Sequence, residues 1–372
     1  MVENSEILRL CRILSPAGLR DDEELAEEIE NGYVDWAKLV EIANINLLTP
    51  ALFASLEQKN LLGLLGERQL TGFLHEIYER NKERNHGILR QIEDIENTLS
   101  GLSIPLLLLK GAADLSEAIY PDIGMRVMND IDIMIGPNRF DEALKLLKES
   151  GYSEFGPAPH RWHHHAPRMC KDGYPAALEP HFRTVFDRDI DYIPFSDLTS
   201  VKSKRAELDS SYVLKPAWHL YHIFLHTQII DSNHRKWRLA LRYLYDFVMV
   251  AKAYEDVAEW AEVYYLAKKY KHEKIFEDFL YLADALFGLK TPIKYNRLRG
   301  WLHLKKCLWE STLLPDTGIY KLYRAYTEFS DIYSYEALKS YYGLRSKREY
   351  PAAFVRYVSY HIRKHLFSDN HT

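Results

Sequence analysis

The chain of 372 residues is 47% hydrophobic and 27% charged, which is the composition of an ordinary globular protein with a sizeable core. Its net charge of −5 gives no overall attraction to nucleic acid. The N-terminus is acidic where a signal peptide is basic, no apolar run reaches the roughly twenty residues of a membrane helix, and the three cysteines are far apart, so we expect a cytoplasmic protein without a membrane segment.

The first hundred residues have helical patterns. They end in a long helix predicted from about Gly66 to Leu99, with apolar positions at helical spacing and a charged opposite face. The character of the chain changes at Ser103, where strand-like runs begin, and it becomes helical again at Lys215. We therefore predict a helical region at 1–100, a core with strands at 101–210 and a second helical region at 211–372.

Short apolar runs mark the strands of the core. Ile104–Leu109 is apolar throughout and bounded by turn residues, as buried strands are. A helix is predicted at Ala112–Tyr120 and a second strand at Asp130–Ile135. Asn138 is expected to cap the following helix, Phe140–Ser150.

Further strands are predicted in the rest of the core, and helices are predicted in the region after it. Strands are expected around 163–169 and 175–184, joined by the hairpin-turn sequence Lys171-Asp172-Gly173-Tyr174, and another near 201–208. The helices predicted after Lys215 include Arg238–Ala253, Val257–Lys269 and Ile275–Phe287.

Two aspartates, Asp130 and Asp132, stand at the start of the second strand. Side chains at positions i and i+2 of a strand point to the same face, so the two carboxylates would lie side by side. Such a pair shifts the pKa of each member unless a cation lies between them, and hard oxygen ligands suit Mg²⁺. The pair therefore predicts half of a metal site for phosphate chemistry.

The turn before these aspartates suits a phosphate group. Between the first strand and its helix, free backbone N–H groups and the helix dipole favour an anion. Gly111 permits close backbone approach there, and Lys110 adds a positive charge. Arg126 could grip phosphate oxygens through two parallel hydrogen bonds, or pair with Asp130, and both roles can coexist.

Glu179 is the candidate for the third acid that two-metal chemistry needs. It lies in the apolar context Ala176-Ala177-Leu178-Glu179-Pro180-His181, where an acid is out of place without a function. A histidine-rich group surrounds this stretch in the sequence. In one interpretation the members of this group are zinc ligands. In a second interpretation, either His164 or His165 lines the nucleotide cleft or orients the acids. The group comprises His160, His163, His164, His165 and His181.

Further polar residues lie in the C-terminal region. His222 and His226 share one helical face, but the intervening glutamate of a metalloprotease motif is absent, so a helix–helix histidine pair is the favoured interpretation. Asp246 lies inside an apolar helical run and is expected to pair with Arg242 or His222.

The order of these motifs resembles the uncharacterised nucleotidyltransferase family NTP_transf_5, in the DNA-polymerase-beta-like superfamily. The resemblance covers roughly residues 30–290. The motifs that carry it are, in chain order, Lys110-Gly111, Tyr120-Pro121, Gly124-Met125-Arg126, Asp130-Ile131-Asp132, His164-His165-Ala166-Pro167, Leu178-Glu179-Pro180-His181, and His222 and His226 followed by Arg242-Tyr243-Leu244-Tyr245-Asp246.

The resemblance implies an α+β fold, with a small mixed-sheet nucleotidyltransferase core flanked by mostly helical N- and C-terminal regions. It implies that Asp130, Asp132 and Glu179 hold Mg²⁺, with Mn²⁺ as the alternative ion, around an NTP. An acceptor then attacks the α-phosphorus and pyrophosphate leaves; this acceptor is a small molecule, a peptide or a protein. The residues expected to bind the nucleotide are Lys110, Gly111, Ala112, Arg126, His165 and His181.

Two alternatives stay open. The turn reads Gly111-Ala112 where the superfamily has Gly-Gly or Gly-Ser, so the phosphate-binding hydroxyl is absent. This difference favours a catalytically weak or inactive module that binds a nucleotide or a partner. The other alternative is a histidine-rich, metal-dependent hydrolase, with zinc at His163, His165 and His181.

Overall fold

The chain divides into two compact units in this computed structural model. The first spans Met1–Phe186 and Asp191–Thr312, and the second Asp187–Ile190 and Leu313–Thr372. Most of the predicted core at 101–210 lies in the first unit with the helices before it, and the predicted region 211–372 is shared between the two. The described residues are 2–19, 23–66, 68–156, 165–185, 191–196, 198–203, 211–255, 259–312, 317–333 and 335–367.

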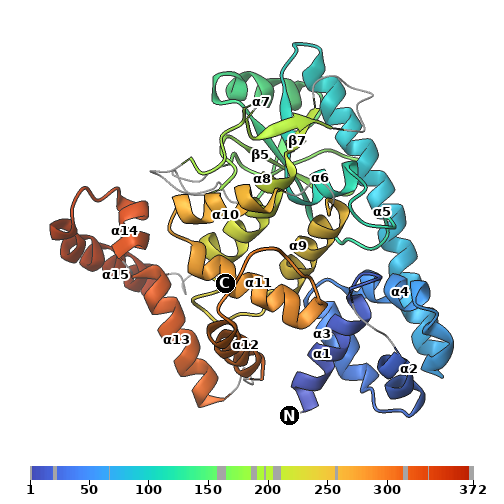
Figure 1. Cartoon of the computed structure of the whole chain (residues 1–372). Coiled ribbons are helices and arrows are strands. Elements are labelled where there is room, and N and C mark those ends of the chain that lie inside the picture. The colour runs from blue at the N-terminus through green and yellow to red at the C-terminus, as the bar shows by residue number, and fades with distance from the viewer. Residues whose placement is uncertain are drawn as a thin grey trace. The chain divides into compact units, whose positions relative to one another are not determined.

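The N-terminal hundred residues are helical, as predicted, and end in the long helix α5 (Arg68–Ser100). One face of α5 is buried, including Ile88, Ile92 and Leu99, and the charged face is exposed. Figure 1 shows α5 running from the N-terminal helices up to the sheet. The elements before it are α1 (Val2–Leu14), α2 (Glu23–Glu30), α3 (Trp36–Ile45), α4 (Thr49–Gln58) and the 3₁₀ turn η1 (Leu62–Leu65).

Seven strands of the described residues form one mixed sheet, in the order β3-β4-β5-β2-β1-β7-β6. The sheet is mixed because β2 pairs with β1 antiparallel and with β5 parallel. This confirms the predicted α+β class. The strands are β1 (Leu106–Leu108), β2 (Asp130–Ile135), β3 (Ser153–Glu154), β4 (Met169–Cys170), β5 (Ala177–His181), β6 (Ser200–Lys202) and β7 (Ser211–Leu214).

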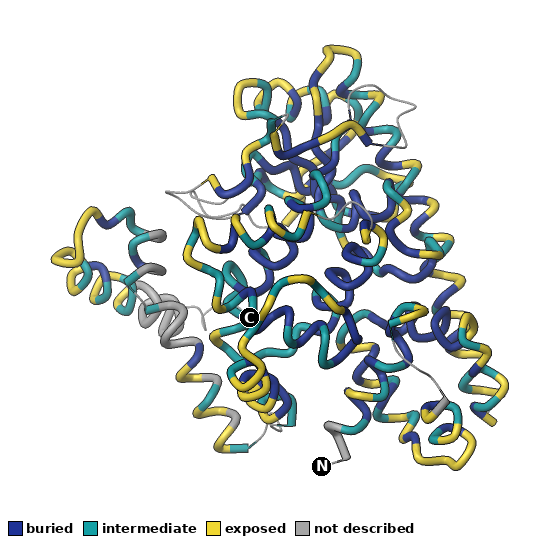
Figure 2. The backbone as a smooth tube through the Cα atoms, viewed as in Figure 1, coloured by how far each residue is buried: buried dark blue, intermediate teal, exposed yellow. Residues whose placement is uncertain are grey.

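The two faces of the sheet pack against different helices. On β2, Ile131 and Ile133 belong to an apolar cluster with α5 and with α7 (Phe140–Glu149). Met134 points to the other face and belongs to the core formed with α8 (Pro216–Phe224) and α9 (Leu241–Ala253). Asp130 and Asp132 alternate with the isoleucines, so their side chains lie on the α8 and α9 side. Figure 2 shows the central part of the sheet as a buried layer, which fits the burial of β1, β2 and β5.

Two local predictions in the core were wrong. Asn138 does not cap α7, because it lies inside the 3₁₀ turn η2 (Pro137–Arg139) and Arg139 is the residue before the helix. The helix after β1, α6, spans Lys110–Ser116 and ends earlier than predicted, because Ala118 adopts a left-handed φ of 51°. The predicted β4–β5 hairpin is confirmed, with Met169 paired to Leu178.

Helices dominate after β7, as predicted. Three of the predicted ranges are confirmed with small shifts of their ends, as α9, α10 (Trp260–Lys269) and α11 (Glu273–Phe287). None of the helices in the described ranges has both the length and the apolar composition needed to cross a bilayer. The remaining elements are the π-helical turn η3 (Leu225–Ile230), α12 (Arg297–Ser311), α13 (Gly318–Ile332), α14 (Tyr335–Tyr342), the 3₁₀ turn η4 (Lys347–Glu349) and α15 (Tyr350–Phe367).

Candidate active site

The register of two parallel strands brings the predicted acids together. Asp132 on β2 is the direct neighbour of Glu179 on β5. Asp130 pairs with Ala177, two residues earlier on each strand and on the same face. The side chains of Asp132 and Glu179 are buried, while 32% of the Asp130 side chain is exposed. Two carboxylates thus lie inside the protein and a third lies at its surface.

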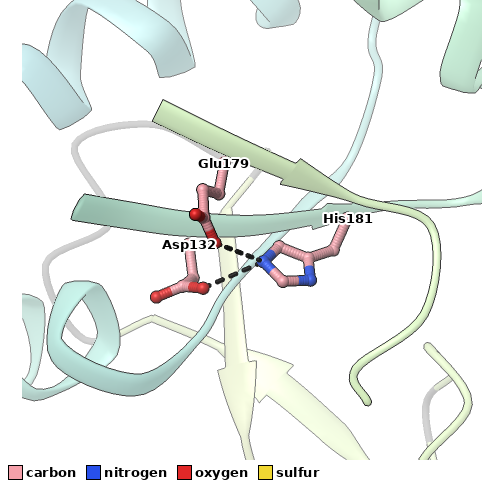
Figure 3. A group of neighbouring side chains, drawn as sticks. All are labelled: Asp132, Glu179 and His181. Carbon is pink, nitrogen blue, oxygen red and sulfur yellow. Dashed lines mark hydrogen bonds and ion pairs between the residues drawn. The ribbon is translucent and has the colours of Figure 1, made fainter. Parts of the chain in front are cut away.

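A histidine completes the buried group. The Nε2 atom of His181 lies 2.9 Å from Asp132 Oδ1 and 3.7 Å from Glu179 Oε2. Figure 3 shows its imidazole pointing at both carboxylates from the end of β5. One possible ligand atom from each of Asp132, Glu179 and His181 lies within 4.8 Å of the others, and no other such group of three occurs in the described ranges. Asp130, predicted as a ligand, is not part of this group.

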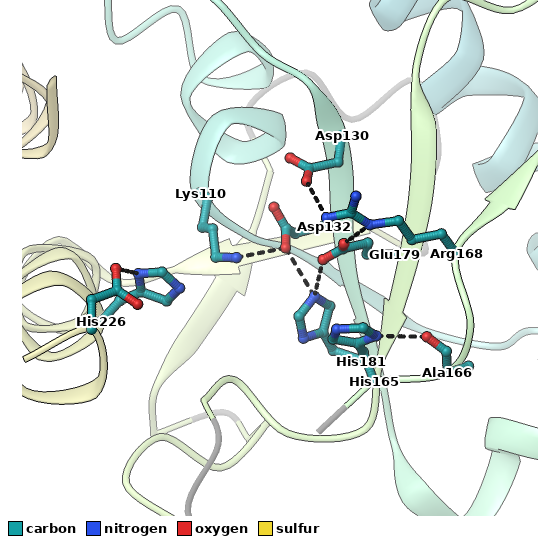
Figure 4. A network of polar contacts seen from close by, with 10 residues as sticks. Lys110, Asp130, Asp132, His165, Ala166, Arg168, Glu179, His181 and His226 are labelled. Atoms are coloured by element: carbon teal, nitrogen blue, oxygen red, sulfur yellow. Dashed lines mark hydrogen bonds and ion pairs between the residues drawn. The ribbon is translucent and has the colours of Figure 1, made fainter. Parts of the chain in front are cut away.

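Two basic side chains surround the acids (Figure 4). Lys110 Nζ lies 2.7 Å from Asp132 Oδ1, the same oxygen that His181 contacts. Arg168 donates a hydrogen bond from Nε to Glu179, and another of its guanidinium nitrogens lies 3.6 Å from Asp130 Oδ2. Every carboxylate of the site therefore has a cationic neighbour from the protein itself.

The pKa values of the buried acids follow from these neighbours. Burial alone would raise the pKa of Asp132, but Lys110 and His181 outweigh it and hold the pKa well below its ordinary value. Burial likewise opposes the hydrogen bonds from His181 and Arg168, which lower the pKa of Glu179 to about 2. Both side chains are thus charged at neutral pH and can receive a cation without losing a proton.

The pKa of Asp130, the partly exposed acid, is shifted in the opposite direction. Burial, followed by the like charges of Asp132 and Glu179, raises the pKa of Asp130. His181 also has a raised pKa, because the hydrogen bonds to Asp132 and Glu179 outweigh its burial. The three acids of the site therefore differ in how readily they hold a proton.

The environment of Arg126 differs from the phosphate-facing one that we expected. Its side chain is 6% exposed, with Nε 2.9 Å from Asp114 Oδ2 and Nη2 2.8 Å from Asp246 Oδ2. Tyr120 donates a further hydrogen bond to Asp246. Arg126 does not pair with Asp130, because Asp114 and Asp246 enclose its guanidinium.

The expected partners of Asp246 were also wrong. Arg242 donates instead to the backbone carbonyl of Val127, at 2.9 Å. Asp246 lies on α9 and Asp114 on α6, so Arg126 joins the helix after β1 to the helices that follow the sheet. This buried ion-pair cluster fixes the turn at Lys110 and Gly111 in place.

Only His165 and His181 of the histidine-rich group lie among the described residues. His165 forms a hydrogen bond between Nδ1 and the Ala166 carbonyl, at 2.6 Å, and its ring centroid lies 5.2 Å from that of His181. The positions of His160, His163 and His164 lie outside the described residues. His181 is the single histidine in the described carboxylate group, and the predicted zinc ligand His163 lies outside the described residues.

Comparison with known proteins supports the chemistry that this geometry suggests. A family model described as uncharacterised nucleotidyltransferase matches residues 33–288. The chain belongs to this family. Neither a search of curated proteins nor a search of solved structures found a match. The matched range contains every site residue of this nucleotidyltransferase named above, from Lys110 to Asp246.

The helix wall of the nucleotidyltransferase site carries further histidines. His222 on α8 is 1% exposed, and neither of its ring nitrogens has a hydrogen-bond partner among the described residues. Burial, then the charge of His226, holds the pKa of His222 well below its ordinary value, so this imidazole is neutral. His226 follows one turn later, with ring centroids 6.3 Å apart, and Figure 4 shows it across Lys110 from the carboxylates. His226 itself lies 3.4 Å from Asp231, between Nδ1 and Oδ2.

Sequence reasoning missed Arg168 and the place of His181 beside Asp132. Arg168 precedes β4, and only the pairing of β4 with β5 brings it to Glu179. His181 was expected to bind the nucleotide, and its distance from Asp132 depends on the β2–β5 register. An available signal for His181 was its spacing from Glu179, since residues two apart on a strand share a face.

Gly111 is required by Arg126 in this structure. A Cβ atom at Gly111 would clash with the Arg126 guanidinium and lie 2.8 Å from Met128 Cγ. Arg126 cannot move aside cheaply, because two buried carboxylates hold it. We therefore expect Gly111→Ala to lower the free energy of unfolding by about 1–3 kcal/mol, measured by urea denaturation.

The matched control for Gly111→Ala is Gly136→Ala, directly after β2. A Cβ atom at Gly136 has no neighbour within 4 Å, and its φ of −55° suits any residue. An equal loss of stability in both variants would contradict the close packing of Gly111 against Arg126.

Proposed function

We propose that this nucleotidyltransferase moves a nucleotidyl group from an NTP to an acceptor molecule, with a divalent ion, Mg²⁺ or Mn²⁺, as the cofactor. One observation carries the proposal: Asp132 and Glu179 lie opposite each other on adjacent parallel strands, with Asp130 on the same face. The spacing of Asp132 and Glu179 allows these two carboxylates to share one divalent ion, as phosphoryl-transfer sites require.

The donor set fits a divalent cation. Two buried carboxylates, both ionised at neutral pH, lie side by side, and Lys110 and His181 approach Asp132 Oδ1 at 2.7 and 2.9 Å. Asp132, Glu179 and the neighbouring Asp130 would hold the ion. When bound, the metal would polarise the α-phosphate and neutralise charge on the leaving pyrophosphate.

The residues around the acids can bind and orient the triphosphate. Lys110 is the nearest ammonium group, and it holds a left-handed φ of 47°, a backbone strain of the kind that is concentrated at functional sites. Gly111 and Ala112 follow it in the first turn of α6, and His165 lies beside His181. We assign nucleotide contacts to these residues and not to Arg126, whose guanidinium is enclosed.

The reaction needs an acceptor oxygen that attacks the α-phosphorus while the bond to the pyrophosphate breaks. A carboxylate with a pKa of about 2, such as Glu179, is a poor base for the acceptor proton at neutral pH. We therefore assign Glu179 as a ligand that stays ionised.

Thermal unfolding tests the proposed function. A ligand that binds only the native state raises the melting temperature. We expect at least one NTP to raise it when Mg²⁺ or Mn²⁺ is present, and to have no such effect on Asp132→Asn. If no NTP shifts the wild-type melting temperature with either ion, the proposal is wrong.

A second function, binding without turnover, is favoured by Ala112. This residue is buried at the phosphate turn and offers no hydroxyl. NTP binding that is not followed by pyrophosphate release, across an acceptor screen with labelled NTPs, would favour this non-catalytic module.

Arg168 is expected to have opposite effects on metal and nucleotide. Its side chain is 54% exposed, and its guanidinium contacts Glu179 and Asp130, two of the proposed metal ligands. Arg168→Met should therefore strengthen metal binding without nucleotide. In the presence of metal we expect this guanidinium to bind a phosphate instead, so Arg168→Met should weaken NTP binding about tenfold. Calorimetry measures both affinities.

The control for Arg168→Met is Arg139→Met, which removes a surface ion pair with Glu142. It should change neither affinity. Weaker metal binding by Arg168→Met would show that the arginine supports the ion site and does not compete with the ion.

A further inference from the structure

We infer that His181 is a metal ligand of this site, and that its imidazole makes the site select a transition-metal ion of the Mn²⁺ type over Mg²⁺. The inference rests on the proposed function, since it assumes that Asp132 and Glu179 hold a divalent ion. It adds the identity of a nitrogen ligand and of the ion that this ligand favours.

The placement of His181 is that of a ligand. Its side chain is fully buried, and Nε2 points between the carboxylates at 2.9 Å from Asp132 and 3.7 Å from Glu179 (Figure 3). Glu179 and His181 share one face of β5, and Asp132 projects beside them from β2. All three ligand atoms come from rigid strands, which gives a metal site more precise geometry than loops do.

Charge neutralisation alone does not explain this imidazole. Lys110 already places an ammonium group 2.7 Å from the Asp132 oxygen that His181 contacts. The His181 ring is also held from its other side, because His165 packs edge-on at 5.2 Å and the backbone of residues 165 and 181 is bridged. These two contacts fix the orientation of the His181 ring beside the carboxylates.

The donor set determines which ion is favoured. Mg²⁺ prefers oxygen ligands in a near-ideal octahedron and binds imidazole poorly. Mn²⁺ accepts carboxylate oxygen and also binds more tightly than Mg²⁺ to nitrogen, while keeping the octahedral positions that phosphate oxygens need. Two carboxylates and one imidazole therefore fit Mn²⁺ better than Mg²⁺.

Pulsed electron paramagnetic resonance of Mn²⁺ bound to the full chain tests the assignment. We expect the wild-type complex to show coupling of the ion to an imidazole nitrogen, and calorimetry to give tighter binding of Mn²⁺ than of Mg²⁺. In His181→Gln the nitrogen coupling should vanish and the Mn²⁺ dissociation constant should rise by about tenfold or more, with Mg²⁺ affinity nearly unchanged.

The matched control is His226→Gln, which removes a histidine on the helix wall outside the carboxylate group. It should keep both the nitrogen coupling and the Mn²⁺ affinity. Loss of the coupling in His226→Gln, with retention in His181→Gln, would overturn the assignment to His181.

The outcomes separate this inference from the proposed function. Mn²⁺ bound without nitrogen coupling in the wild type would overturn the role of His181 while the carboxylate site stands, and this result needs no variant to fold. Absence of binding by either ion, with or without NTP, would overturn the proposed function as well. Asp132→Asn tests the carboxylate site separately from the role of His181, because loss of this carboxylate should remove metal binding altogether.

Discussion

Asp132→Asn should lower the rate of nucleotidyl transfer by at least about 10³-fold. Asp132 contacts Lys110 and His181 and is the direct neighbour of Glu179 in the register of β2 and β5. Losing about 4 kcal/mol of electrostatic stabilisation in the transition state corresponds to such a factor. The measurement is pyrophosphate release from the NTP that gives the largest thermal shift.

The asparagine in this variant has nearly the size of the aspartate, so packing is preserved and the change is one of charge. The control is Asp94→Asn on α5, which removes a carboxylate paired with Lys171 at 2.7 Å. It should keep the wild-type rate. A rate for Asp132→Asn within about tenfold of the wild type would mean that the reaction does not depend on this carboxylate.

Arg126→Met should lower the free energy of unfolding by about 3–5 kcal/mol, the largest stability effect that we expect in the chain. The substitution leaves Asp114 and Asp246 buried without their shared cation, at 2% and 5% side-chain exposure. Removing one partner of a buried ion pair costs far more than removing an exposed one. Chemical denaturation followed by circular dichroism measures the loss.

Arg139→Met again serves as the comparison, because its ion pair with Glu142 is exposed. Its effect should stay below about 1 kcal/mol. If Arg126→Met were no more destabilising than Arg139→Met, then the buried cluster would not hold α6 and α9 together as the distances indicate.

Features set by neighbouring residues could be predicted from the sequence. The bounds of β2, the shared face of Asp130 and Asp132, and the position of α5 follow from apolar periodicity and strand alternation, which act over a few residues. The strand context of Glu179 was readable for the same reason. The resemblance of several ordered motifs then indicated the family that the comparison shows.

Features set by distant pairing could not be predicted. Arg126 meets Asp246 across 120 positions of the chain, and Asp132 meets His181 across 49. Periodicity predicts that such polar residues are buried, but it does not say which opposite charge shares their pocket. Arg126 was therefore expected at the phosphate, and Arg168, next to a two-residue strand, was not expected in the site.

The most direct test of the central claim is calorimetric titration of each NTP into the metal-free protein, with and without Mn²⁺ or Mg²⁺. We expect heat of binding only when a divalent ion is present, and none with Asp132→Asn, because the carboxylates bind the nucleotide through the ion. Equal NTP affinity in the presence of a chelator, or unchanged affinity in Asp132→Asn, would contradict a metal-dependent nucleotide site on β2 and β5.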